Sequence, residues 1–216
     1  MISCQQVTMS WSLFDAKGQR KYLTPTERAA FIRAAFKAEP TTSSFCLTLA
    51  LTGARISEAL ALTPDRLDAS DNVIVLETLK RRRKGLFRAV PVPQELLSYL
   101  GAVHDLPRHA ANDRLWNFSR PTAWKRVKGI MTTAGIGPSQ AKPKALRHTF
   151  AVEAVRQRIA LSLIKKWLGH AKIETTALYA APVGDEERAL ARLMWQAMSL
   201  DGQFDPRRTP ARRSRA

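Results

Sequence analysis

The sequence predicts a mainly α-helical domain that carries one small antiparallel β-hairpin. Apolar residues recur at helical spacing through most of the 216 residues, and capping, glycine and proline signals mark where the segments end. One β-branched run, at 73–76, breaks that pattern and is followed by a basic turn and a second extended run. The length suits one folded domain, which we place at 23–200, between an N-terminal arm at 1–22 and a basic, disordered tail at 201–216.

The first two helices are marked by their end signals. Thr24 is the expected N-cap of the first helix, with Pro25 at its first position and Glu27 completing a capping box. Pro40 is expected to end that helix. Residues 43–51 are almost all apolar, which predicts a buried second helix.

The hairpin is expected within 71–92. Residues 73–76 form its first strand and residues 86–92 its second, while the RRRKG segment at 81–85 supplies a strongly basic turn. The remaining elements follow from helical periodicity, from the cap at Ser119 and from acidic residues that suit the start of the last helix. Helices are expected at 56–62, 94–100, 119–134, 145–158, 161–168 and 185–200, with a loop at 101–114.

Composition restricts the partners. Thirty-five Lys and Arg against 18 Asp and Glu give a formal charge of +17, which favours a polyanion and above all double-stranded DNA. No apolar run is long enough to span a membrane, and the N-terminus lacks the pattern of a signal peptide. The two cysteines, Cys4 and Cys46, form no paired motif, so we expect a reducing, cytoplasmic setting.

Residues 144–179 contain the chemistry. Arg147, His170 and Tyr179 are a strong cation, an imidazole and a phenol, the set needed to hold a phosphodiester while a tyrosine attacks it. Arg55 follows a glycine in apolar surroundings and offers a second guanidinium. Its alternative role is a helical ion pair with Glu58, three residues later.

Four segments, LTGARISEAL, KALRHTF, WLGH and TTALYA, resemble the boxes of the tyrosine recombinases, the phage integrase family, in the same order. The resemblance runs from about Leu23 to Leu193 and implies that residues 23–200 form a catalytic domain. It also implies six catalytic residues: Arg55, Lys80, Lys144, Arg147, His170 and Tyr179.

The assignment of Lys144 departs from the family pattern, and the assignment of Lys80 has an alternative. Lys144 stands where the family usually has histidine, and a lysine is a poor base unless it is desolvated. The lysine that protonates the leaving oxygen in the family lies on a β-hairpin; we assign it to Lys80, with Lys84 as the alternative. Contact with the DNA backbone is expected for the basic turn residues Arg81, Arg82, Arg83 and Lys84.

The resemblance implies a site-specific recombinase that cuts and rejoins DNA through a 3′-phosphotyrosyl link and acts as a tetramer on two DNA sites. With it goes the expectation of a bacterial cytoplasm and of nucleoid-associated DNA. No Asp, Glu or His cluster has metal-ligand spacing, so we expect no metal and no cofactor. The family's usual N-terminal helical domain is expected to be missing. Two alternatives remain: a type IB topoisomerase-like relaxation of DNA, and a non-catalytic DNA-binding regulator on the same scaffold.

Overall fold

The computed structural model describes residues 13–79, 85–106, 108, 110–170 and 176. The chain divides into two units, residues 1–180 and 181–216, and every described residue belongs to the first. The predicted fold class is confirmed: helices predominate and one small antiparallel sheet is present. The elements are α1 (Pro25–Phe36), α2 (Pro40–Thr52), α3 (Ile56–Leu60), η1 (Pro64–Arg66), β1 (Leu67–Asp68), β2 (Val73–Glu77), β3 (Phe87–Pro91), α4 (Gln94–His104), α5 (Arg120–Thr133), α6 (Pro143–Arg156) and α7 (Leu161–Leu168).

The capping box at the start of α1 is confirmed, since Thr24 accepts the Glu27 N–H and Glu27 accepts the Thr24 N–H. The expected role of Pro40 is wrong, because α1 has already ended at Phe36 and Pro40 begins α2. A proline fits the first helical turn, where its missing N–H has no partner to lose. The Glu39 carboxylate caps that turn by accepting the N–H groups of Thr41 and Thr42.

Helix α2 is the centre of the core, as its apolar sequence predicts. Nine of its residues are buried, and α1, α4 and α6 pack around it. The Phe45 ring packs edge-on against Trp116 and Phe118, with ring centroids 5.2 and 5.8 Å apart. The Trp116 indole N–H is satisfied by Ser44 at 3.0 Å, so the largest buried side chain leaves no polar group unpaired there.

The sheet has three strands in the order β1-β2-β3, one more than the hairpin expected from sequence. Leu67 and Asp68 pair with Ile74 and Val73, and a two-residue strand has no periodicity that a sequence pattern can detect. Strands β2 and β3 pair from Val73–Pro91 to Glu77–Phe87, which confirms the expected hairpin. Along each of these two strands, buried residues alternate with more exposed ones, and Ile74, Leu76 and Val90 are fully buried.

Helices α4 and α6 differ from their expected bounds. Helix α4 continues through Gly101 to His104, because His104 is buried against Trp116 and within 3.2 Å of Ser44, and this packing outweighs the poor helix propensity of glycine. Helix α6 starts at Pro143, two residues earlier than expected. Helices α5 and α7 match their expected spans closely, with Ser119 as the N-cap of α5.

Part of the expected arm carries local structure. Phe14 and Arg20 form an isolated antiparallel bridge around a turn at Asp15, and Leu13 and Tyr22 are buried. The next residue, Leu23, donates its N–H to Thr149 on α6 at 2.8 Å. This bond fixes the chain against the domain just before α1 begins.

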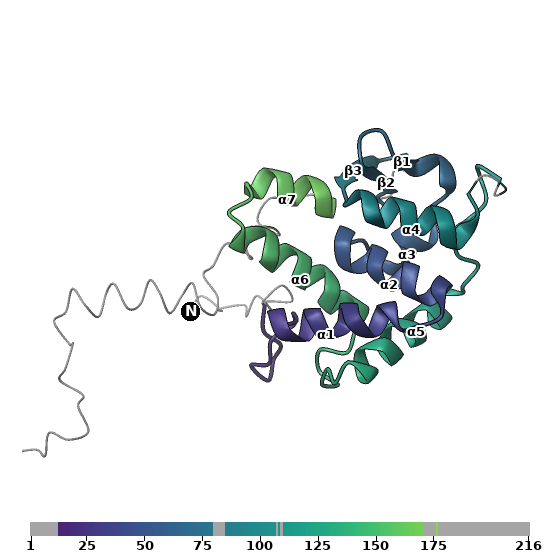
Figure 1. Ribbon diagram of the computed structural model, residues 1–216. Coiled ribbons are helices and arrows are strands. Elements are labelled where there is room, and N and C mark those ends of the chain that lie inside the picture. The colour runs from purple at the N-terminus through teal and green to yellow at the C-terminus, as the bar shows by residue number, and fades with distance from the viewer. Residues whose placement is uncertain (1–12, 80–84, 107, 109, 171–175, 177–216) are drawn as a thin grey trace, which may run out of the picture. The chain divides into compact units, whose positions relative to one another are not determined.

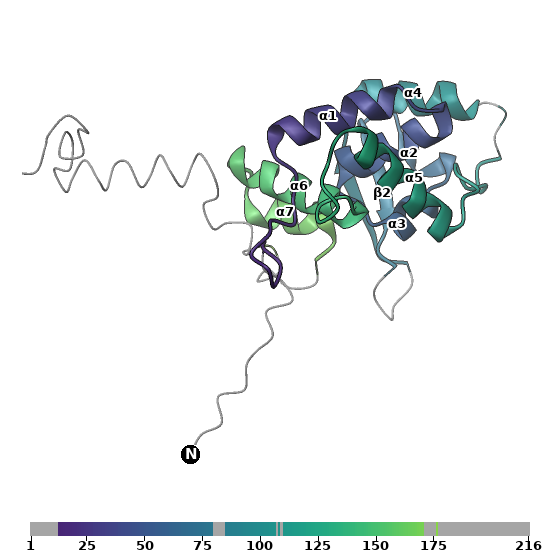
Figure 2. The same cartoon turned by 90° about the horizontal axis from the view of Figure 1, so that it is seen from below.

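The sheet lies beside the helices, with α7 next to β3 (Figure 1). Seen from below, α1 and α4 lie along one side, and α3 lies toward the other (Figure 2). This arrangement brings α3, β3, α6 and the end of α7 together, although they are far apart in the sequence. None of the helices described is long and apolar enough to span a membrane.

Two glycines allow a matched test of the packing between α2 and the helices α6 and α7. Gly53 has φ +63°, and a Cβ there would lie 2.8 Å from the Phe150 ring and 3.0 Å from Leu168. We expect Gly53→Ala to lower the free energy of unfolding by about 1–3 kcal/mol, through strain and overpacking. Gly129 lies in the middle of α5 with nothing within 4 Å of such a Cβ, so Gly129→Ala should raise stability by about 0.5–1 kcal/mol. Urea unfolding of both variants checks this, and equal effects would contradict it.

Candidate active site

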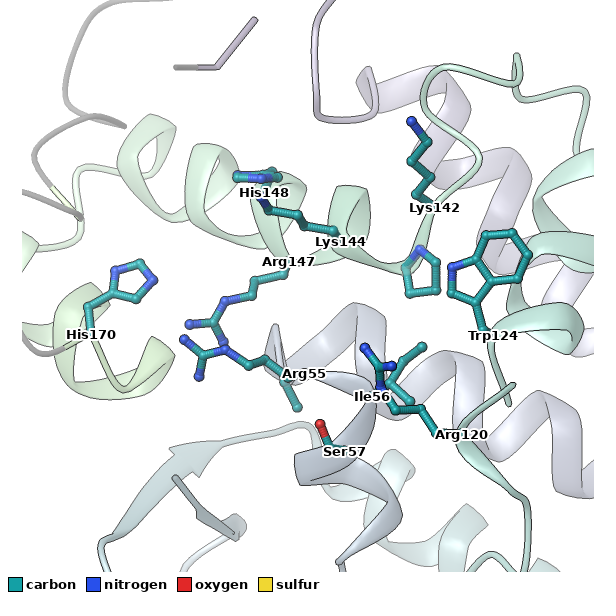
Figure 3. Close-up of a pocket in the computed structure, with 12 residues that line it drawn as sticks. Arg55, Ile56, Ser57, Arg120, Trp124, Lys142, Lys144, Arg147, His148 and His170 are labelled. Carbon is teal, nitrogen blue, oxygen red and sulfur yellow. The ribbon is translucent and has the colours of Figure 1, made fainter. Parts of the chain in front are cut away.

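A cavity of about 420 Å³ lies where α3, α5, α6 and the end of α7 meet (Figure 3). It collects four of the six expected catalytic residues. Arg55 and Arg147 enter from different helices with their guanidinium groups side by side, and the His170 ring lies beyond them (Figure 3). The lining residues are Ala54, Arg55, Ile56, Ser57, Arg120, Trp124, Lys142, Pro143, Lys144, Arg147, His148 and His170.

Arg55 is placed by the break between α2 and α3. Gly53 ends α2 in the left-handed region, and Arg55 is the extended N-cap residue of α3. Glu58 accepts both the Arg55 N–H at 3.0 Å and the Arg55 Nη1 at 2.6 Å. The expected ion pair with Glu58 is therefore present, and the Arg55 side chain, 28% exposed, still reaches the cavity. Arg55 therefore pairs with Glu58 and also lines the cavity, whereas Glu58 itself is not among the lining residues.

Glu58 is a fully buried carboxylate shared by several arginines. Its Oε1 pairs with Arg55 at 2.6 Å, and its Oε2 pairs with Arg88 at 2.6 Å and lies 4.0 Å from Arg147. Burial acts to raise the pKa of Glu58, but the charges of Arg88 and Arg55 outweigh it and hold that pKa below its usual value. The carboxylate thus stays ionised and fixes guanidinium groups from three separate elements.

Arg147 is buried in the second turn of α6. Its Nη1 donates to the Gly53 carbonyl at 2.8 Å and its Nη2 to the Leu168 carbonyl at 2.5 Å, so it bridges the ends of α2 and α7. Both carbonyls belong to helix ends, where backbone acceptors lack intrahelical partners. A guanidinium carries five N–H donors in a planar fork, so this anchoring fixes its direction and is compatible with phosphate binding.

His170 is placed by the C-terminal cap of α7. Gly169 adopts φ +63°, and the His170 N–H donates back to the Lys165 carbonyl at 3.1 Å, which is a Schellman ending. The ring is buried, with Nδ1 3.0 Å from the Thr176 hydroxyl. Burial, then the charges of Arg147 and Arg55, lower the pKa of His170 to about 3. The imidazole is therefore neutral in the free protein and can supply a hydrogen bond without a charge.

The rest of the cavity adds positive charge. Lys144 is exposed near the start of α6, and Lys142, Arg120 and Trp124 line the other end (Figure 3). None of its lining residues is acidic. The N-terminus of α6 also lies at the cavity, and helix N-termini favour anions. A cavity with five Lys and Arg side chains and a helix N-terminus suits a phosphodiester.

Two parts of the expected site lie outside the described residues. One is the proposed nucleophile, Tyr179. The other is the tip of the hairpin, with Lys80, Arg81, Arg82, Arg83 and Lys84.

Sequence reasoning missed Arg88. This residue is buried on β3, with its guanidinium against Glu58, and it shares an inward strand face with Val90. Strand alternation contained the signal: an arginine in phase with a core valine must find a buried partner. It also overlooked Arg120, Trp124 and Lys142, which carry no pattern of their own.

No group of three or more His, Cys, Asp or Glu side chains within the described ranges is arranged to hold a metal ion. The charged and titratable side chains that line the cavity carry guanidinium, ammonium and imidazole groups, which suit an anion.

Two of the buried histidines, His148 and His170, make stability depend on pH. Burial, then Lys144 and Arg147, lower the pKa of His148 to about 4, and that of His170 is about 3, whereas unfolded histidine titrates near 6.5. Between these values the unfolded chain binds more protons, so the free energy of unfolding falls as the pH is lowered. We expect a loss of about 3 kcal/mol from pH 7 to pH 5 for the pair, measured by urea unfolding.

His148→Gln is the control for that experiment, because it should remove about half of the pH dependence. A free energy of unfolding that is the same at pH 7 and pH 5 in the unsubstituted protein would contradict the neutral state of both rings.

Comparison with known proteins agrees with this geometry. Residues 21–184 match the family model described as the phage integrase family. The tyrosine recombinase XerD of Neisseria meningitidis is 32% identical over 139 residues, which cover 59% of this chain and 46% of XerD. The chain thus spans about half the length of the curated relatives it matches.

Solved structures show the same fold. The crystal structure of XerA recombinase superposes with a TM-score of 0.65 and 28% identity, over 82% of this chain and 62% of XerA. The XerH site-specific recombinase bound to its difH substrate gives a TM-score of 0.67 at 20% identity, over 84% of this chain and 59% of XerH. With its fold, its clustered arginines and a family match over most of its length, the chain belongs to the phage integrase family.

Proposed function

We propose that this protein is a site-specific DNA recombinase that cuts and rejoins double-stranded DNA through a 3′-phosphotyrosyl intermediate, without a metal or cofactor. The observation that carries the proposal is the cavity in which Arg55, Lys144, Arg147 and His170 meet. These residues lie on three separate segments of the chain, and no acidic residue lines the cavity that they share. Such convergence favours a bound phosphate over a set of unrelated ion pairs.

In the proposed step, the Tyr179 hydroxyl oxygen attacks a phosphorus of the DNA backbone and forms a P–O bond to the phenol. The P–O bond to the 5′ oxygen breaks, and that oxygen takes up a proton as it leaves. The phenol gives up its own proton, so the step is balanced and the bond energy is kept for rejoining. Arg55 and Arg147 offset the negative charge that grows on the non-bridging oxygens, which is the role of fixed cations in phosphoryl transfer.

The other residues receive supporting roles. His170 donates a hydrogen bond to the same phosphate, and Lys144 binds it or takes part in proton transfer. We assign protonation of the leaving oxygen to Lys80, with Lys84 as the alternative. The basic turn, Arg81 to Arg83 with Lys84, is proposed to contact the DNA backbone.

DNA is the partner that the charge of the chain supports. The net charge of +17 would give a salt-dependent affinity, because phosphate contacts release bound counterions. XerH, which shares this fold, was solved bound to its difH substrate. We propose a tetramer on two DNA sites in the bacterial cytoplasm, in which residues 185–200 exchange between neighbouring subunits. Its role would be integration, excision or inversion of a mobile element.

Two other functions would use the same cavity. A type IB topoisomerase-like enzyme would form the same covalent link but relax supercoiled DNA without choosing a sequence. A regulator would bind DNA and form no link. The family match and the similarity to XerD favour the recombinase.

The covalent step can be tested with a pool of nicked DNA duplexes that contain a randomised stretch, in which cleavage releases a short strand and traps the adduct. We expect the protein to form an adduct that resists denaturant and to enrich a shared sequence. Tyr179→Phe should abolish the adduct while the dissociation constant for DNA changes by less than about threefold, since one hydroxyl adds little to binding. Electrophoresis under denaturing conditions measures the adduct.

Tyr99→Phe is the matched control and should form the adduct normally, because Tyr99 lies on α4, where its ring is near that of Phe36. An adduct in Tyr179→Phe would remove Tyr179 from the mechanism. Adducts without a shared sequence would favour the topoisomerase, and DNA binding with no adduct would favour the regulator.

The two arginines should matter more for cleavage than for binding. We expect Arg55→Ala and Arg147→Ala each to slow adduct formation by about 10²- to 10³-fold, the usual cost of losing one charge-stabilising donor in a transition state. The dissociation constant for DNA should change by less than about tenfold, because many other cations contact the backbone. Single-turnover rates at saturating protein separate the two effects.

Arg126→Ala is the control for these variants. Arg126 pairs with Glu39 and Thr42 away from the cavity, so its loss should leave the cleavage rate unchanged. Equal losses of cleavage and binding in Arg55→Ala or Arg147→Ala would make that arginine an anchoring contact only.

A further inference from the structure

Arg88 makes a distinct contact with each part of its guanidinium. Its Nη2 pairs with Glu58 of α3 at 2.6 Å, and its Nη1 donates to the Thr78 hydroxyl at 3.0 Å, just after β2. Its Nε donates to the Trp167 carbonyl in the last turn of α7 at 2.7 Å. With a side chain only 5% exposed, Arg88 joins three elements from inside the protein and does not line the cavity.

The contact with Glu58 bears on Arg55. The carboxylate gives one oxygen to each arginine, Oε1 to Arg55 and Oε2 to Arg88. Without Arg88, Oε2 would keep only the Arg55 N–H at 3.0 Å and Arg147 at 4.0 Å. A buried carboxylate that loses a charged partner draws in another cation or takes up a proton, and either response moves the phosphate-binding arginines.

The contact with α7 bears on His170. Arg88 and Arg147 bind successive carbonyls, those of Trp167 and Leu168, which lie three and two residues before His170. Between them and His170 lies Gly169, where a Cβ would meet Thr78 Oγ1 at 3.0 Å and Arg88 Nη1 at 3.1 Å. The turn that directs His170 into the cavity is therefore packed against the Arg88 side chain.

We propose that Arg88 is a positioning residue of the active site, which acts through Glu58 on Arg55 and through the last turn of α7 on His170. It contacts neither the proposed phosphate position nor the cavity itself. This inference rests on the proposed function, because it assigns Arg88 an effect on the same cleavage step.

The test compares cleavage with binding in Arg88→Met, on a nicked duplex that the unsubstituted protein recovers from the randomised pool. We expect the rate of adduct formation, per folded molecule and at saturating protein, to fall by about 10- to 100-fold, as for a small misplacement of catalytic groups. The dissociation constant for the same duplex should stay within about threefold, since Arg88 does not face the DNA-binding cavity. A purely structural arginine would lower the melting temperature and leave the rate per folded molecule unchanged.

Two further variants identify the route. If Arg88 acts through Glu58, Arg88→Met combined with Glu58→Gln should cleave no more slowly than the slower single variant, because the buried charge has gone with its partner. Arg88→Lys keeps the charge but cannot make all three contacts, so its rate should lie between those of the unsubstituted protein and Arg88→Met. If Arg88→Met does not fold, Arg88→Lys takes its place, and a rate at least about threefold below normal at unchanged affinity is expected.

Arg66→Met is the matched control. Arg66 pairs with Glu77 at 3.6 Å and lies over the Phe87 ring on the same sheet, away from the cavity, so its loss should not change the rate. A normal rate in Arg88→Met, or in Arg88→Lys where that variant replaces it, would overturn the proposal. Parallel losses of rate and affinity, or losses that add fully in the double variant, would also overturn it. If the unsubstituted protein forms no adduct, it is the proposed function that fails.

Discussion

The site depends on one buried carboxylate, that of Glu58. Three guanidinium groups approach it from α3, β3 and α6, and none of these arginines could be buried cheaply without an opposite charge. The carboxylate cancels only one of the three charges, so the cluster keeps a net positive charge at the wall of the cavity. Glu58 thus holds three arginines close together beside the cavity, where their net positive charge favours an anion such as phosphate. Arg147 joins the ends of α2 and α7 to the same network.

This arrangement is preorganised for an anion. The arginines are held by backbone carbonyls and by the Glu58 carboxylate before any ligand arrives, so little reorganisation would be needed if charge developed on a phosphate there. The neighbouring cations also affect His148 and His170. Burial is the main cause that lowers the pKa of each ring, and the cations lower it further, so both rings are neutral. His170 can therefore contribute a directed hydrogen bond without adding to the repulsion between the arginines.

Backbone geometry supports the electrostatics at two glycines. Gly53 and Gly169 both end helices in the left-handed region. The Gly53 carbonyl accepts a hydrogen bond from Arg147, and Gly169 directly precedes His170. Gly53 is packed against Phe150 and Leu168, and Gly169 against Thr78 and Arg88. The helix ends that place Arg55 and His170 are therefore fixed by close packing as well as by hydrogen bonds.

Local signals in the sequence determined most of the elements, since caps, periodicity and β-branched runs act over a few residues. They placed Thr24 as a cap, the strands β2 and β3, and the helices α5 and α7. The four boxes also named Arg55, Lys144, Arg147 and His170, which share one cavity. Tertiary structure decided what depends on distant partners: the extension of α4 to His104, the pairing of β1, and the burial of Arg88 against Glu58, 30 positions away. A short-range pattern can show that an arginine faces inward, but only the folded chain determines which carboxylate meets it there.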